Sequence, residues 1–328
     1  MKILIWHVHG SWMTAFVQGA HEYLLPVDEE RGPDGRGRAQ TWDWPASARE
    51  VTAEQLAGEV AGDGGSSGRP DLVVLQRPHE AALLQEWTGL RAGVDVPAVY
   101  LEHNAPTGSA AASRHPYADQ DAIPVVHVTY FNQVMWDTGT APTDVIEHGV
   151  LDPGALYTGE RGSLAVVVNE PVRRTRVAGT DLMLRLSREL PVEVYGMGMD
   201  SLASVAPWLG GSLHENLRQS ELHHALAAHR AYFHPYRWTS LGLALLEAMT
   251  LGIPVLALST TEAARAVPAS AGLLSNNLDE LAQRGRQWLD EPELAAEAGR
   301  AARSHAKDRY GLERFLADWD ALVERVVA

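Results

Sequence analysis

One stretch of the chain, residues 232–262, combines the residue types from which an anion-binding site is built. It reads YFHPYRWTSLGLALLEAMTLGIPVLALSTTE. The pattern predicts a buried strand, then a helix that begins at Thr239 or Ser240, either of which can cap it, and ends at Leu251. The first turn of this helix carries no charged side chain, so its amide hydrogens and the positive end of its dipole are available to an anion. Gly242 lets such a ligand approach the backbone closely.

Glu247 is the only acid on this otherwise apolar helix. Thr239 precedes it by eight residues, which on an α-helix is about 12 Å of rise and about 80° of rotation, so both side chains can face one elongated ligand. That span suits a nucleotide sugar, with the ribose hydroxyls at Glu247 and the sugar near the start of the helix. The alternative is a buried helix that packs on a sheet and carries one capped or paired glutamate.

Three arginines, Arg173, Arg174 and Arg176, follow a predicted strand at Leu164–Val168. The chain has a formal net charge of −15, and Lys2 and Lys307 are its only lysines. Arginines that cluster after a strand in such an acidic chain form a local positive site suited to bidentate phosphate contacts. A solvated loop is the alternative interpretation, and the sequence does not say which arginine points inward.

The first half of the chain places polar residues where predicted strands end. His103 ends the strand in Tyr100–Asn104, and a loop containing Gly10, Ser11 and Trp12 follows the first strand. Ligands of α/β proteins bind at the carboxyl ends of parallel strands. These positions therefore suit a binding site, although such a histidine can also be structural and Trp12 can pack in the core as readily as stack on a sugar.

Short apolar runs alternate with segments of helical period, which predicts a parallel α/β sheet in each half of the chain. Glycine-rich or polar loops are expected over 27–38, 62–70 and 105–116, and a domain join over 151–162. The predicted strands are Lys2–Val8, Asp71–Leu75, Pro97–Leu101, Pro124–Thr129, Asp144–Ile146, Leu164–Val168, Val192–Tyr195, Ala231–His234 and Pro254–Leu258. The predicted helices include Met13–Leu24, Thr180–Leu190 and Leu241–Leu251, and the segments after residue 277 are also helical.

Composition excludes several classes of function. The 328 residues suit two domains, and the lack of cysteine excludes thiolate nucleophiles, disulfides and Cys-ligated metal sites. The acid excess argues against nucleic-acid binding and against docking on anionic membranes, both of which need clustered positive charge. Neither a signal peptide nor a membrane-spanning segment is predicted, which suggests a cytoplasmic protein.

The segment from Thr239 to Ala257 resembles the signature of the GT-B glycosyltransferases of family 4. In that family a glutamate and a second glutamate eight positions later stand in the context E-G-F-G-x-x-x-x-E-A-M-A-x-G-x-P-V-V. The matching residues are Gly242, Glu247, Ala248, Met249, Gly252, Pro254 and Val255. Thr239 stands where the family has its first glutamate, so the sugar contacts are expected to pass to Thr239, Ser240 and the amides of Leu241 and Gly242.

The resemblance also assigns roles outside this segment. Residues 144–151 are similar to the family's interdomain segment, and the arginines at 173, 174 and 176 take the place of its diphosphate-binding Arg and Lys. His103 would face the donor sugar and, with Thr239, is the expected catalytic residue. Gly10 and Ser11 would lie beside the donor phosphates, and Glu262 would help to shape the sugar pocket. No metal ion is expected.

The implied fold is α/β of the GT-B type, with two Rossmann-like domains facing a central cleft and a C-terminal helix that crosses back. The expected domains are an acceptor domain over 1–152, a nucleotide-sugar domain over 163–308 and a final helix over 309–328. The implied function is retaining, metal-independent transfer of a sugar from a nucleotide diphosphate sugar, with UDP or GDP as the nucleotide. The acceptor would be a glycan, a lipid-linked molecule or a small molecule, and no cofactor is expected. The alternatives are a sugar-nucleotide epimerase of the same architecture and a non-catalytic sugar-nucleotide-binding protein.

Overall fold

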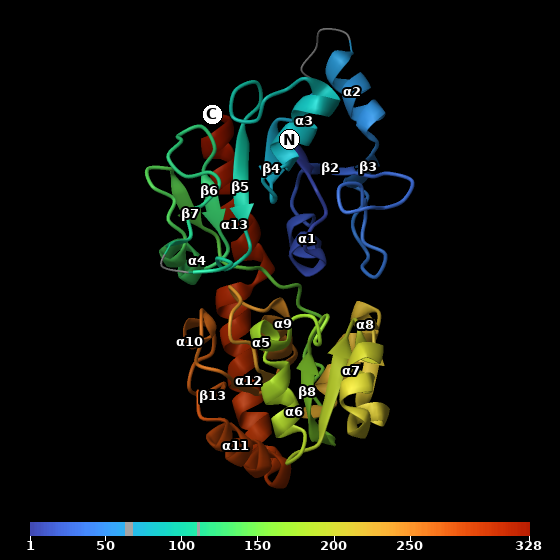
Figure 1. Cartoon of the computed structure of the whole chain (residues 1–328), viewed down its shortest axis with the longest axis vertical. Coiled ribbons are helices and arrows are strands. Elements are labelled where there is room, and N and C mark those ends of the chain that lie inside the picture. The colour runs from blue at the N-terminus through green and yellow to red at the C-terminus, as the bar shows by residue number, and fades with distance from the viewer. Residues whose placement is uncertain (63–67, 110–111) are drawn as a thin grey trace. The chain divides into compact units, whose positions relative to one another are not determined.

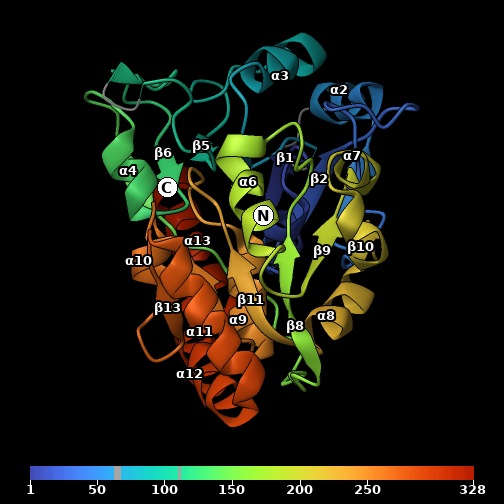
Figure 2. The ribbon, with the colours of Figure 1, turned by 60° about the horizontal axis from the view of Figure 1, so that its bottom comes forward.

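The computed structural model describes residues 1–62, 68–109 and 112–328. The predicted loops over 62–70 and 105–116 include residues 63–67 and 110–111, which lie outside the described residues. The chain divides into two compact units (Figure 1). Unit 1 comprises Met1–Gly149 and Leu312–Ala328, and unit 2 comprises Val150–Gly311. Figure 2 shows the strands of unit 2 in a row, with β8 between β9 and β11.

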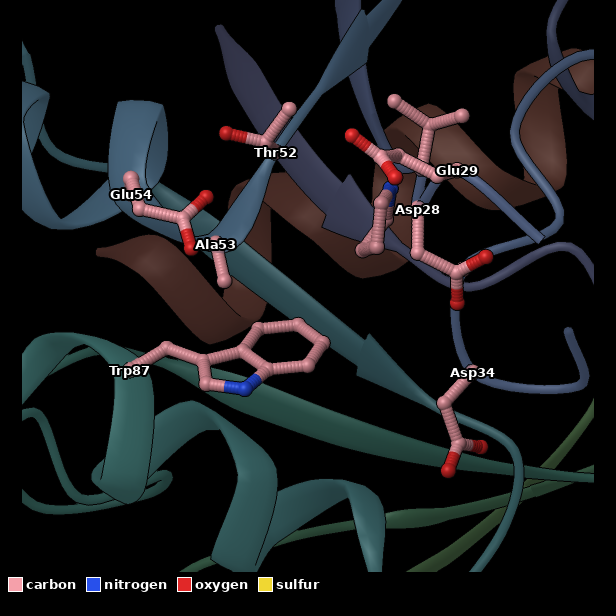
Figure 3. Close-up of a pocket in the computed structure, with 10 residues that line it drawn as sticks. Asp28, Glu29, Asp34, Thr52, Ala53, Glu54 and Trp87 are labelled. Atoms are coloured by element: carbon pink, nitrogen blue, oxygen red, sulfur yellow. The ribbon is translucent and has the colours of Figure 1, made fainter. Parts of the chain in front are cut away.

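Within its described residues, unit 1 has a seven-stranded sheet in the order β3-β2-β1-β4-β5-β6-β7, with parallel pairing throughout. The strands are β1 (Lys2–Ile5), β2 (Glu22–Pro26), β3 (Ala48–Val51), β4 (Leu72–Leu75), β5 (Ala98–Glu102), β6 (Val125–His127) and β7 (Thr143–Val145). The helices are α1 (Gly10–Phe16), α2 (Ala53–Ala61), α3 (Glu80–Thr88), α4 (Tyr130–Met135) and α13 (Leu312–Val327). A pocket of about 500 Å³ opens beyond the carboxyl ends of β2 and β3 (Figure 3).

The last helix, α13, belongs to unit 1 although it follows unit 2 in sequence. Its aromatic side chains pack on those of α1: Trp319 lies 5.6 Å from Trp12 and 4.9 Å from Phe16 between ring centroids. Phe315 meets Trp12 edge to face at 5.8 Å. This aromatic contact agrees with the predicted return of the C-terminal helix. It also shows that Trp12 is a buried packing residue.

Unit 2, as described, has a six-stranded sheet in the order β10-β9-β8-β11-β12-β13, also parallel throughout. The strands are β8 (Arg161–Val167), β9 (Val192–Gly196), β10 (Leu213–Glu215), β11 (His229–His234), β12 (Val255–Ala257) and β13 (Gly272–Leu274). The helical segments are α5 (Thr175–Ala178), α6 (Thr180–Leu186), α7 (Met199–Val205), η2 (Pro207–Ser212), α8 (Gln219–Ala227), α9 (Leu243–Leu251), α10 (Ala263–Ala266), α11 (Leu278–Asp290) and α12 (Pro292–Tyr310).

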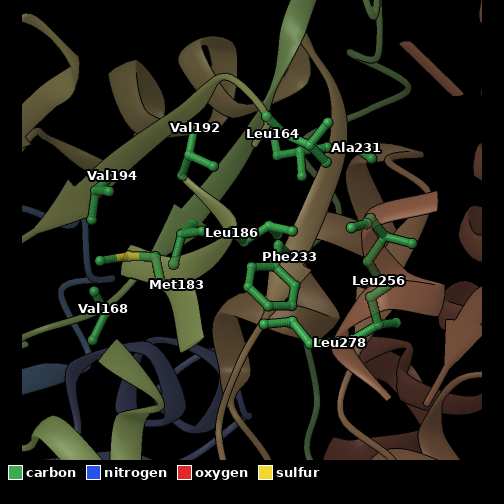
Figure 4. Close-up of a cluster of buried hydrophobic side chains, with 14 of the residues drawn as sticks. Leu164, Val168, Met183, Leu186, Val192, Val194, Ala231, Phe233, Leu256 and Leu278 are labelled. Atoms are coloured by element: carbon green, nitrogen blue, oxygen red, sulfur yellow. The ribbon is translucent and has the colours of Figure 1, made fainter. Parts of the chain in front are cut away.

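Both faces of the unit 2 sheet are covered, which explains the continuous apolar runs at residues 164–167 of β8 and throughout β12. Successive strand side chains alternate between the faces. Leu164 and Phe233 therefore belong to the core beneath α6 and α11 (Figure 4), whereas Ala165 and Tyr232 belong to the opposite core, which contains α9. The central strands are consequently rigid supports for the loops at their carboxyl ends.

The two strands at one side of the unit 1 sheet, β2 and the edge strand β3, differ from the prediction. A helix is predicted over Met13–Leu24, but α1 ends at Phe16 and β2 begins at Glu22. The prediction is wrong because Tyr23 and Leu24 pair with Ile3 and Leu4 of β1, and this pairing overrides the local helical pattern. The adjacent strand β3 has no counterpart in the prediction and is stabilised in the same way by β2.

Candidate functional site

The centre of unit 2 contains a topological switch point. From β8 the chain proceeds to β9 on one side, and it later returns to place β11 on the other side of β8. In open α/β sheets, ligands bind beyond the carboxyl ends of the strands at such a point. Two loops meet here, one after β8 and one between β11 and α9. They contain most of the site residues that the sequence predicts for the second half of the chain.

The segment after β8, which continues through α5 to the start of α6, is held against the loop after β11 by polar contacts and close packing. The Arg237 guanidinium donates hydrogen bonds to both carboxylate oxygens of Asp181, at 2.6 and 2.7 Å. Gly179, with φ of 71°, leaves no room for a Cβ beside the carbonyl oxygen of Pro235. The backbone amide of Arg237 donates to the carbonyl of Val177 at 3.0 Å. Sequence patterns assign no role to Asp181 or Arg237, because only the tertiary structure brings them together.

The three predicted arginines have different environments. Arg174 lies with its guanidinium carbon 5.6 Å from the ring centroid of Tyr236, on the loop after β11. Arg176 is bound to Asp181 at 3.0 Å, and its side chain is 75% exposed. Arg173 is 72% exposed and lies 3.7 Å from Glu170. Arg174 is therefore the arginine held against the switch point, and its partner Tyr236 was not predicted from the sequence.

The helix after β11 begins later than predicted. Its N-cap is Gly242, in an extended conformation, so neither Thr239 nor Ser240 caps it, and the predicted start is wrong. The chain stays extended because Gly242 packs against His234: a Cβ on Gly242 would lie 2.5 Å from His234 Cε1. Thr239 thus lies before the helix, and the predicted helical relationship between Thr239 and Glu247 does not hold.

The N-terminus of α9 keeps the property that makes it a candidate anion site. No described side chain caps it, and its first turn contains no acid. The amides at the helix start belong to residues 243 and 244, whereas those of Leu241 and Gly242 precede the helix. An uncapped helix N-terminus presents amide hydrogens and a positive dipole end to an anion.

Glu247 is buried within α9, with 6% of its surface exposed. Burial raises the pKa of Tyr232 on β11, and the charges of Tyr236 and Glu247 raise it further. A carboxylate held on an apolar helix and against the sheet can accept hydrogen bonds from ligand hydroxyls.

Glu262 lies at the carboxyl side of β12, where α10 begins. It is 3% exposed and occupies the N-cap position, but its side chain makes no capping hydrogen bond. Instead, Arg265 Nε lies 3.2 Å from Glu262 Oε1. The carboxylate is therefore a buried, paired group at the same edge of the sheet as His234.

Unit 1 has its own switch point, between β1 and β4. His103, after β5, lies 2.8 Å from Gln76 Oε1 through its Nε2 atom, and its ring centroid is 4.2 Å from that of His9. Burial, reinforced by His9 and His148, holds the pKa of His103 well below its ordinary value. His103 is therefore a neutral imidazole near neutral pH. Neither Gln76 nor His148 was predicted as a site residue: Gln76 belongs to no motif, and residues 144–151, which include His148, were assigned only as an interdomain segment.

Gly10 and Ser11 follow β1 as predicted, but as the first residues of α1 and not as a loop. The prediction of a loop is wrong here because the apolar side chains of α1 pack into the aromatic core with α13. Gly10 lies near His7: a Cβ on Gly10 would be 3.6 Å from His7 Nε2. The predicted site residues thus form two groups, one at the switch point of each unit.

Known proteins share this architecture. Residues 212–305 match the family model of glycosyl transferases group 1. Sucrose-phosphate synthase from Thermosynechococcus elongatus is similar in structure, with a TM-score of 0.70, 14% identity, and coverage of 99% of this chain and 98% of that one. Anabaena HepE, solved with UDP and glucose, has a TM-score of 0.69 and 14% identity over 99% and 100% of the chains. A search of curated proteins finds no match.

WaaG, a glycosyltransferase involved in lipopolysaccharide biosynthesis, is also similar, with a TM-score of 0.65 and 14% identity over 99% of both chains. The two parallel-sheet units and these similarities establish the GT-B fold. The part of unit 2 that contains α9 carries the group 1 glycosyltransferase match. In the part of the chain that the structure describes, no helix is long and apolar enough to cross a membrane.

Proposed function

We propose that the chain is a glycosyltransferase that moves a sugar from a nucleotide diphosphate sugar to an acceptor hydroxyl with retention of anomeric configuration. The observation that carries the proposal is the arrangement of α9, whose uncapped N-terminus faces the switch point and whose only acid, Glu247, is buried. This helix lies inside the region that matches glycosyl transferases group 1. The structurally similar HepE was solved in complex with UDP and glucose, which supports a nucleotide-sugar donor.

The donor, with UDP or GDP as its nucleotide, would bind in unit 2. Glu247 would accept hydrogen bonds from the ribose hydroxyls. Arg174 and the first amides of α9 would hold the diphosphate, where the arginine fork and the helix dipole match its charge. Because charge grows on the leaving diphosphate as the glycosidic bond breaks, the same groups would stabilise the transition state.

The sugar would be held by further predicted residues of unit 2, namely Thr239, Ser240 and Glu262. We infer that the reaction needs no metal ion, because Arg174 and the helix amides supply positive charge at the diphosphate. Thr239 lacks the carboxylate that the resembled family has at this position, so the leaving diphosphate would take the proton of the acceptor hydroxyl.

Replacement of Glu247 tests the proposal. Calorimetric titration with UDP and GDP is expected to show that Glu247→Ala weakens nucleotide binding at least tenfold, which is about 1.4 kcal/mol. Glu297→Ala is the matched control, because Glu297 is an exposed glutamate within α12. Full nucleotide affinity in Glu247→Ala would contradict the proposed role of this residue. Isomerisation of the donor sugar without an acceptor would favour an epimerase.

A further inference from the structure

The pocket in unit 1 lies where β2 and β3 end and α2 begins, at the carboxyl edge of the sheet. Its volume is about 500 Å³, and all its lining residues belong to unit 1. Figure 3 shows the Trp87 indole on one side of the space, with Glu54 at one end and Asp28 and Asp34 at the other. Pockets of this size at this edge of a parallel sheet hold small ligands.

Carboxylates dominate the charge of this pocket. Asp28, Glu29, Asp34 and Glu54 line it, and none of the described lining residues is positively charged. Asp34 is balanced by Arg77 at 2.8 Å, and His79 Nε2 lies 2.9 Å from Asp34 Oδ1.

The other three acids have no such balance. No described cation forms an ion pair with Asp28, Glu29 or Glu54. Arg31 is bound to Glu50 at 2.8 Å, and this hydrogen bond, followed by the charges of Glu50 and Asp28, raises the pKa of Arg31. The pocket therefore carries negative charge that is available to a cation.

The start of α2 does not make this pocket an anion site. The Gln55 amide donates to the Thr52 hydroxyl at 3.2 Å, and the Thr52 amide donates to the Gln55 side chain at 2.9 Å. Hydrogen bonding to its own backbone amide, and then to Thr52, lowers the pKa of Glu54. The amides that would attract an anion are thus occupied by the protein's own groups.

The aromatic wall is a feature independent of the acids. Trp87 on α3 packs on Trp6, with 5.9 Å between ring centroids, and is half-buried. An indole face attracts an ammonium group through its quadrupole and packs on the apolar face of a sugar ring. Trp87 and the carboxylates together match an amine that also has an apolar surface.

We propose that this pocket binds an acceptor that carries a protonated amine beside its hydroxyl groups, such as an amino sugar. The ammonium group would lie at Asp28 and Glu29, and the ring would pack on Trp87. The proposal rests on the proposed function for its assignment to the acceptor. It agrees with the charge of the first 150 residues, which contain 9 Lys and Arg against 20 Asp and Glu.

Binding of two matched sugars to the full chain tests the charge preference. Glucosamine, at a pH where its amine is protonated, is expected to bind at least about tenfold more tightly than neutral N-acetylglucosamine in ligand-detected NMR titrations. Its affinity should fall as the salt concentration rises, because salt screens exposed charges. Equal affinities, or no detectable binding of glucosamine, would overturn the proposal.

Variants locate the binding to this pocket. Glu29→Gln and Asp28→Asn are each expected to weaken glucosamine binding about threefold, the size of an exposed ion pair. Trp87→Leu is also expected to weaken it about threefold through the lost cation–π contact. Glu86→Gln is the control, because it removes the same charge from the exposed side of α3 without lining the pocket. Equal effects of Glu29→Gln and Glu86→Gln would contradict the pocket assignment.

UDP or GDP titration of the same variants separates this proposal from the proposed function. The nucleotide is expected to bind unit 2 and to be unaffected by Glu29→Gln. If glucosamine binds as expected but no nucleotide does, the proposed function fails while the amine site stands. If the nucleotide binds and glucosamine does not, the amine site fails alone.

Discussion

Gly242 lies directly against the imidazole of His234, so closely that a Cβ on Gly242 would be 2.5 Å from His234 Cε1 and 3.2 Å from Nε2. The two residues join the end of β11 to the start of α9. His234 in turn stacks on Tyr236, with 4.6 Å between ring centroids, and Tyr236 meets Arg174. The glycine therefore sets how closely the N-terminus of α9 approaches the switch point.

Gly242→Ala is expected to weaken nucleotide binding about tenfold and to lower the free energy of unfolding by about 1–3 kcal/mol, the usual cost of overpacking. The added methyl group must displace either His234 or the start of α9. Calorimetric titration with UDP and GDP, together with denaturant unfolding, measures both effects.

Gly210→Ala is the matched control, because a Cβ on Gly210 would have no neighbouring atom within 4 Å. The double variant Gly242→Ala, His234→Ala should recover part of the lost stability, since contacting sites are not additive. Additive losses in the double variant would show that the close approach to His234 is not the cause.

Arg174→Ala is expected to weaken binding of nucleoside diphosphates about tenfold, because it removes a charge-assisted hydrogen bond to phosphate. Arg173→Ala removes the same charge from a side chain that is 72% exposed, so it should change the affinity little. Calorimetric titration of both variants with UDP and GDP measures the two affinities. A larger loss in Arg173→Ala would reverse the assignment of the diphosphate contact.

The Asp181–Arg237 pair is expected to support donor binding by holding the loops that it joins in position. Asp181→Ala should weaken nucleotide binding and should also make the loop after β8 more susceptible to proteolysis. A double-mutant cycle with Arg237→Ala should show coupling, because the two side chains share two hydrogen bonds. Independent effects of the two substitutions would argue against this role.

Acid should destabilise unit 1 partly through His127. This histidine is fully buried on β6, its ring nitrogens have no partner among the described residues, and burial lowers its pKa to about 3. In the unfolded chain, the His127 imidazole takes up a proton near its ordinary pKa of 6.5, whereas in the folded chain it stays neutral down to about pH 3. The contribution of neutral His127 to the free energy of unfolding is therefore fully present above pH 6.5. It is lost progressively as the pH falls toward 3.

His127→Leu removes this linkage while keeping a buried side chain of similar size. Relative to its value at pH 7, the free energy of unfolding of the variant should fall about 2 kcal/mol less than that of the native chain when the pH is lowered to 5. Urea unfolding at the two pH values measures the difference. A difference between the two proteins that does not change with pH would contradict the prediction.

Much of the fold follows from local sequence patterns. Continuous apolar strands such as Leu72–Leu75 and Val255–Ala257 are predictable from sequence because each must bury both faces in a parallel sheet. Elements with weak local preference were not predictable in this way. Strand β2 forms because β1 offers it hydrogen bonds, and β3 forms because β2 does, while the start of α9 is set by the packing of Gly242 on His234.

The sequence by itself determined the chemistry available: an acid on an apolar helix at Glu247, arginines after a strand, and a histidine at a strand end. Residue type and spacing along one element suffice for these, because they depend on local periodicity. Only the tertiary structure decided that Arg174 meets Tyr236, that Asp181 fastens the loops, and that Asp28 and Trp87 share a pocket. These residues are far apart in sequence, and the order of the strands brings them together.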